Sequence, residues 1–139
     1  MRDTTTVLYT GKTRTTSGGR DGAARSSDGR LDIQLSSPGS KGAGTNPDQL
    51  FAAGWSACFI GAMGLAAGKL GLKLPSDAHV DAEVDLCNLN GAYFLQARLD
   101  VHLPGLPAEI AQTLVAAAHQ TCPYSKATQG NIDVDIRVV

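Results

Sequence analysis

The segment from Asn46 to Lys69 limits the possible folds more than any other part of the chain. Asn is a favoured N-cap, and Pro47 suits the first helical position, where its missing N–H would have no partner. Apolar residues then recur at the helical spacing of three and four: Phe51, Trp55, Cys58, Ala62 and Leu65. Glycine and alanine fill most of the other positions and allow close packing. The pattern predicts a helix from Pro47 to about Lys69 that is buried on more than one side.

The segments around this helix alternate between apolar and polar residues, which is typical of strands. A second helix is predicted at about Pro107 to Gln120, and Cys122-Pro123 repeats the cap-then-proline pattern of a short further helix or turn. The resulting order indicates one α+β domain spanning residues 1–139. The predicted strands are Thr6–Thr13, Leu31–Leu35, Val80–Leu86, Leu95–Leu103 and Ile132–Val138, with a hairpin turn at Asn88–Gly91.

Composition excludes several classes of protein. The formal net charge is -1, from 12 basic and 13 acidic residues without a basic run, so nucleic-acid binding is not expected. No uninterrupted apolar stretch reaches about eighteen residues, so no membrane span is expected. The start lacks the apolar core of a signal peptide. Three cysteines without a Cys-x-x-Cys pair are atypical of a secreted disulfide framework, which favours a cytoplasmic location.

The three histidines do not indicate a metal site. His79, His102 and His119 are far apart along the chain and show no ligand spacing with one another or with the cysteines. We therefore expect no metal and no bound cofactor, and we assign ordinary structural positions to His102 and His119. A serine hydrolase is equally unsupported, because the chain has no Gly-x-Ser-x-Gly elbow.

The cysteines carry more information, and the residues alone leave their roles open. Cys58 near the middle of the long helix is either a small core residue or a reactive thiol. A mid-helix thiol gains nothing from the helix dipole, so reactivity requires an outside cation such as Arg20, which Asp48 could orient. Cys122 is either a thiolate favoured by a helix N-terminus or a packing residue. Cys87, beside the hairpin turn, is interpreted as structural.

Several motifs resemble those of the organic hydroperoxide resistance proteins, a branch of the OsmC/Ohr superfamily. They occur in the same order along nearly the whole chain. The segments that carry these motifs are Gly18–Gly22, Gly44–Pro47, Gln49–Phe59, Ala116–Ser125 and Gly130–Val134. The long helix motif and the Cys-Pro-Tyr-Ser motif are the most specific of these.

The resemblance implies a thiol peroxidase of the antioxidant stress response. Cys58 corresponds to the peroxidatic cysteine, Cys122 to the resolving cysteine and Arg20 to the arginine that activates the first thiolate. A Cys58–Cys122 disulfide is then re-reduced by a dihydrolipoyl group on a carrier protein. The implied fold is an OsmC/Ohr-like α+β fold, with antiparallel sheets around a long central helix in an intertwined homodimer.

One position departs from the family pattern, because Asp48 stands where the family usually has glutamate. Asp48 and Cys58 are ten positions apart, about 15 Å along a continuous helix. One Arg20 is therefore not expected to reach both within a single helix. Either the two residues of one site come from different subunits, or the arginine network is looser here.

Phe51, Trp55, Phe59 and Met63 surround Cys58 in the sequence and predict an apolar substrate pocket. Such a pocket favours alkyl, aryl or fatty-acid hydroperoxides over hydrogen peroxide. Two alternatives remain: a peroxidase of the sister OsmC branch, and a non-catalytic dimer that binds a small ligand and keeps both cysteines inert.

Overall fold

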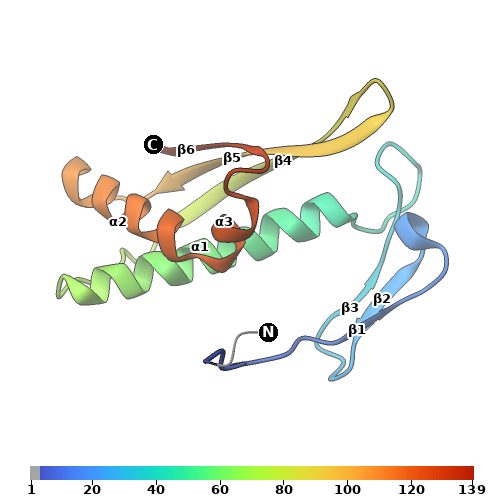
Figure 1. Ribbon diagram of the computed structural model, residues 1–139, viewed down its shortest axis with the longest axis horizontal. Helices are drawn as coiled ribbons and strands as arrows, with labels where there is room; N and C mark the ends of the chain where they lie inside the picture. The colour runs from blue at the N-terminus through green and yellow to red at the C-terminus, as the bar shows by residue number, and fades with distance from the viewer. Residues whose placement is uncertain (1–3) are drawn as a thin grey trace. The chain divides into compact units, whose positions relative to one another are not determined.

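The computed structural model describes residues 4–139 (Figure 1). The chain divides into two compact units, one up to Pro47 and one from Asp48 to Val139. Mixed helices and strands, with two small sheets and one long helix, confirm the predicted α+β class.

The first unit is a three-stranded antiparallel sheet in the order β1-β2-β3. The predicted strand Thr6–Thr13 is wrong over most of its length, because β1 begins only at Thr13. Val7, Leu8 and Tyr9 are exposed, and the described residues offer this segment no strand pairing. The elements are β1 (Thr13–Thr15), the 3-10 helix η1 (Gly19–Asp21) in the predicted glycine-rich turn, β2 (Ala23–Ser26) and β3 (Asp32–Gln34).

The second unit begins with α1 (Pro47–Lys69), with the bounds that the proline and glycine signals predict. By length and composition, α1 is apolar enough to cross a membrane. Its buried residues nevertheless pack into the core of this unit, together with residues of β5 and α2. They are Trp55, Phe59, Ala62, Met63 and Ala67.

A long antiparallel hairpin follows, formed by β4 (His79–Leu89) and β5 (Ala92–His102). The turn is tighter than predicted and consists of Asn90 and Gly91, at φ 53° and 87°. Two successive positive φ values suit a two-residue hairpin turn, and Asn-Gly is the preferred pair for it. The register is therefore symmetric about this turn, from Leu89 opposite Ala92 to His79 opposite His102.

The chain then passes through α2 (Ala108–Thr121) and α3 (Pro123–Thr128) to β6 (Asp133–Val138). β6 lies beside β5 and runs parallel to it, so the expectation of antiparallel sheets is corrected for this pair. The physical reason is the helical crossover, which returns the chain to the end of the sheet where β5 began. Figure 1 shows α1 and α2 on one side of the β4-β5-β6 sheet. Residues of both helices and of the sheet form one hydrophobic core.

Candidate active site

Two cysteines that are distant in sequence meet at the junction of α1, α2 and α3. Cys58 projects from the middle of α1, and Cys122 is the extended residue between α2 and α3. The backbone N–H of Cys122 donates to Ala118, and the N–H of Lys126 donates to the carbonyl of Cys122. These bonds hold Cys122 between the helices, with its Sγ 2.9 Å from Cys58 Sγ.

Both residues are free thiols in contact, and they differ in exposure. Cys122 is fully buried, whereas Cys58 is half-buried. The sulfur–sulfur distance of 2.9 Å exceeds the covalent length of about 2.05 Å. The two cysteines are therefore not joined by a disulfide in this structure, and Cys58 is the more exposed residue of the pair.

The surroundings of Cys58 within its own unit favour the neutral thiol. Burial raises the pKa of Cys58 above its usual range, and the hydrogen bond shared with Cys122 raises it further. A backbone hydrogen bond from Tyr124 lowers the pKa of Cys58 and opposes these two effects. Thiolate formation near neutral pH therefore requires positive charge from elsewhere, as the sequence argument also concluded.

A buried hydrogen bond holds the two cysteine-bearing elements together. Trp55 Nε1 on α1 donates to Ser125 Oγ on α3 over 3.1 Å, and both residues are fully buried. Trp55 lies one helical turn before Cys58, and Ser125 lies three residues after Cys122. The sequence analysis did not identify this bond, although a tryptophan on a buried face needs an acceptor for its N–H.

An aromatic group lies beside this bond. The ring of Phe51 is 5.4 Å from that of Trp55 and 6.2 Å from that of Tyr124, which is partly exposed. Gly54 permits this approach, because a Cβ there would lie 3.3 Å from the Tyr124 ring. Phe51, Gly54 and Tyr124 thus form an apolar surface next to the dithiol.

The other residues of the predicted substrate pocket are enclosed. Trp55, Phe59 and Met63 are fully buried and belong to the hydrophobic core, while Phe51 is partly buried. Their common role in the structure is core packing beneath the dithiol. Contact with a substrate stays a prediction for all four.

The remaining candidate residues belong to η1, to the first turn of α1 and to the β4-β5 hairpin. Arg20 lies in η1 of the first unit, and Asp48 lies in the first turn of α1 in the second. Asp21, next to Arg20, accepts hydrogen bonds of 2.9 Å from the backbone N–H and the hydroxyl of Ser37, and these bonds lower the pKa of Asp21. Cys87 lies on the β4-β5 hairpin opposite Phe94.

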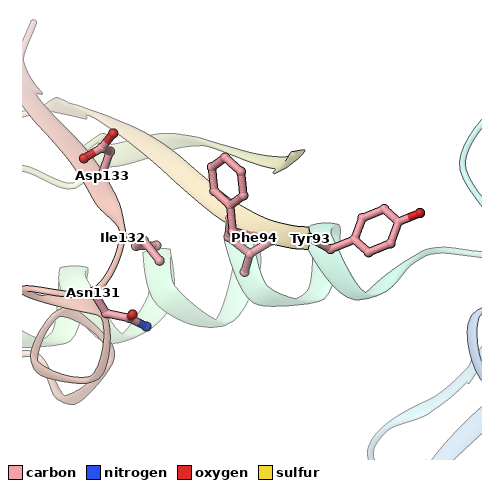
Figure 2. Close-up of a pocket in the computed structure, with 6 residues that line it drawn as sticks. Tyr93, Phe94, Asn131, Ile132 and Asp133 are labelled. Carbon is pink, nitrogen blue, oxygen red and sulfur yellow. The ribbon is translucent and has the colours of Figure 1, made fainter. Parts of the chain in front are cut away.

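A hollow of about 560 Å³ lies at the sheet, and its lining contains neither cysteine nor histidine (Figure 2). Tyr93, Phe94 and Leu95 of β5 line it together with the residues leading into β6, Asn131 to Asp133. Figure 2 shows the Tyr93 side chain pointing away from Asn131 and Ile132. The contact between Cys58 and Cys122 therefore lies at the α1–α3 junction, outside this hollow.

The fold and the site define an α+β protein in which a thiol on the long helix contacts a second, buried thiol. The OsmC-like protein family matches residues 39–137 of the chain. The organic hydroperoxide resistance protein of Xanthomonas axonopodis pv. citri (strain 306) is 49% identical over 134 residues, which cover 94% of each chain. OhrB of Bacillus subtilis (strain 168) is 42% identical over 137 residues, which cover 95% of this chain and 98% of OhrB.

A solved structure supports the same assignment. The crystal structure of Bacillus subtilis OhrB matches with a TM-score of 0.89 at 40% identity, covering 96% of this chain and 100% of that one. The chain therefore belongs to the OsmC-like family, and within it to the organic hydroperoxide resistance proteins. This confirms the resemblance that the motifs carry and associates the chain with the detoxification of organic peroxides.

Proposed function

We propose that this protein is a thiol peroxidase that reduces organic hydroperoxides to alcohols through Cys58 and Cys122. The contact between Cys58 Sγ and Cys122 Sγ, in a member of this family, is the observation that carries the proposal. A dithiol with one open and one buried sulfur suits a reaction in which the open sulfur attacks and the buried one resolves.

The chemistry balances with these two sulfurs. The Cys58 thiolate attacks one peroxide oxygen, an S–O bond forms, the O–O bond breaks, and the leaving alkoxide takes up a proton to become an alcohol. Cys58 is then a sulfenic acid. The Cys122 sulfur attacks the Cys58 sulfur, water leaves, and a disulfide forms. A dihydrolipoyl group on a carrier protein supplies the two electrons and two protons that restore both thiols.

Arg20 supplies the positive charge that the surroundings of Cys58 require. A full charge beside Cys58 would offset the effect of burial on its pKa. Asp48, through a bidentate contact, would orient the guanidinium. Since Asp48 and Cys58 share one continuous helix, about 15 Å apart, either the Asp48 of a given site comes from the other subunit or the arginine network is looser here.

The surface beside the dithiol suits an apolar substrate. Phe51 and Tyr124 adjoin the open side of the pair, and burying an alkyl group contributes about 0.8 kcal/mol per methylene. Alkyl, aryl and fatty-acid hydroperoxides are therefore the expected substrates. Comparing kcat/KM for cumene hydroperoxide and hydrogen peroxide tests this, and equal values would contradict it.

The functional unit is a homodimer located in the cytoplasm. Leu65 and Leu70, at the C-terminal end of α1, are 75% and 53% exposed in the single chain, beside a hollow between α1 and α2. An exposed apolar surface on a core helix suits a second subunit. Leu65→Glu should shift the protein from dimer to monomer in sedimentation analysis, and an unchanged dimer would place the interface elsewhere.

The decisive experiment counts thiols after one equivalent of cumene hydroperoxide is added to the reduced protein. Loss of two thiols, with peptide mapping to a Cys58–Cys122 disulfide, supports the peroxidase. Cys122→Ser should stop at a Cys58 sulfenic acid, and Cys58→Ser should not react. Unreacted thiols, or oxidation confined to Cys87, would favour a non-catalytic ligand-binding dimer.

A further inference from the structure

A cluster of metal-ligating side chains lies on the outer face of the β4–β5 hairpin. His79 and His102 are directly opposite each other in the ladder, and Asp81 follows His79 on the same face of β4. The side chains of Val80 and Val101 point to the other face and pack against the core. His79 and His102 are far apart along the chain, yet the tight turn of the hairpin brings them opposite each other.

The ligand atoms of this cluster converge. One side-chain atom from each of His79, Asp81 and His102 lies within 4.8 Å of the other two. His102 Nε2 is 3.1 Å from an Asp81 carboxylate oxygen. The two imidazole rings stack with centroids 4.1 Å apart and planes 10° apart. We propose that His79, Asp81 and His102 bind a divalent first-row transition-metal ion, with Zn²⁺ as the representative.

The orientation of His79 supports this proposal independently of the distances. Its Nδ1 is 2.9 Å from the backbone carbonyl of Asp77. A carbonyl only accepts, so Nδ1 carries the proton and Nε2 keeps the lone pair that a metal needs. A backbone carbonyl bound to the other ring nitrogen is the usual arrangement around a metal-ligating histidine.

The charges on this face also favour a cation at Asp81. Asp81 stands opposite Asp100 in the ladder, and like charges at opposed positions destabilise a sheet. Arg137 neutralises Asp100 through two hydrogen bonds of 3.0 Å. Within residues 4–139, the ion pairs of the structure give Asp81 only His102 as a partner. A bound metal ion would neutralise Asp81 and link β4 to β5.

The donor set defines the kind of site. Two imidazole nitrogens and one carboxylate oxygen suit Zn²⁺ and its neighbours better than Ca²⁺ or Mg²⁺. Zinc ligands lie about 2.0–2.2 Å from the ion, so the three side chains must move closer together. His79 and Asp81 are exposed and can rotate. Water completes the coordination, which makes the site weaker than a four-ligand structural zinc site.

Isothermal titration with Zn²⁺ tests the proposal. Because adjacent thiols also bind zinc, the test uses full-length, tag-free protein carrying Cys58→Ser and Cys122→Ser. We expect one ion per chain, with Kd raised at least about tenfold by His79→Gln or His102→Gln. Asp135→Asn is the matched control, since it removes an exposed carboxylate from β6 and leaves the three ligands intact; its Kd should not change. No saturable binding, or equal binding by all variants, overturns the proposal.

Two further measurements keep the result independent of folding defects in the histidine variants. Zn²⁺ should shift the imidazole ¹⁵N resonances of His79 and His102, and leave those of His119 unchanged, in otherwise wild-type protein with both thiols blocked. Zn²⁺ should also raise the unfolding temperature of that protein, because an ion that binds only the folded state stabilises it. Shifts confined to His119, or no shifts, would overturn the assignment.

Discussion

Titratable groups gather in two regions of this molecule, and the two regions treat them in opposite ways. At the α1–α3 junction, burial and a thiol neighbour raise the pKa of Cys58 and so favour the neutral thiol. On the outer face of the β4-β5-β6 sheet, hydrogen bonds from Arg98 and Gln96 lower the pKa of Asp85 to about 2 and keep it ionised. The junction favours the uncharged form of its thiol, whereas the sheet face keeps its charges in water and pairs them.

The two regions also differ in how much their residues contribute to stability. The junction combines apolar burial with the buried bond from Trp55 to Ser125, so these residues contribute to packing as well as to positioning the two cysteines. The sheet face carries ion pairs that are open to solvent, and such pairs contribute little individually. Substitutions in the two regions should therefore differ strongly in their effect on the free energy of unfolding.

The largest expected difference is between Trp55→Ala and Tyr93→Ala. Trp55 is fully buried, and its truncation should lower the free energy of unfolding by about 3–5 kcal/mol. Tyr93 is 73% exposed and projects from the hairpin (Figure 2), so its truncation should cost about 0.5 kcal/mol or less. Denaturant unfolding at one fixed protein concentration measures both, and similar losses would contradict the contrast.

Ser125→Ala tests how much the buried hydrogen bond from Trp55 to Ser125 contributes to stability. It leaves Trp55 Nε1 buried without its acceptor, which should cost about 1–3 kcal/mol. Combining it with Trp55→Phe, which removes the N–H, should cost less than the sum of the two single changes. Additive losses in the same unfolding assay would show that the bond contributes nothing of its own.

Arg20→Met tests whether the positive charge of Arg20 lowers the pKa of Cys58 and so opposes the effect of burial. We expect the iodoacetamide alkylation rate of Cys58 at pH 7 to fall at least about tenfold, since each unit of pKa is a tenfold change in thiolate. The control is Arg30→Met, in the same unit, whose side chain is 91% exposed. Cys87→Ser in all three proteins removes a competing thiol. Equal rates in the two variants would remove Arg20 from the site.

The sequence predicted those elements whose ends or turns are set by residues close together in the chain. The bounds of α1 follow from Pro47 and the residues just after Lys69, and the hairpin follows from Asn90-Gly91. The Thr6–Thr13 strand failed because a strand requires a partner that alternation in the sequence does not supply.

The candidate site depended on contacts between distant residues, which local patterns do not specify. Only the family resemblance brought Cys58 and Cys122 together, and nothing local indicated the bond from Trp55 to Ser125. The closeness of the two histidines could have been predicted from the sequence, since a two-residue turn at Asn90-Gly91 places His79 opposite His102 in the hairpin.

The smallest expected effect is a loss of stability at low pH that arises from Asp85 on the sheet face. Arg98 donates to both carboxylate oxygens of Asp85 over 2.9 Å, and Gln96 donates to one of them over 2.7 Å. These bonds lower the pKa of Asp85 from 3.8 to about 2. A lowered folded-state pKa stabilises the protein above the unfolded-state value, and that stability is lost as the pH falls through the folded-state value.

The free energy of unfolding should therefore decline between about pH 4 and pH 2 in the wild type, and more shallowly in Asp85→Asn. Asp77→Asn removes an exposed carboxylate from the turn before β4, outside this network, and should keep the wild-type slope. Chemical unfolding across this pH range gives the three slopes. If Asp85→Asn kept the full decline, the acid sensitivity would belong to other carboxylates, and the bonds from Arg98 and Gln96 to Asp85 would not contribute to it.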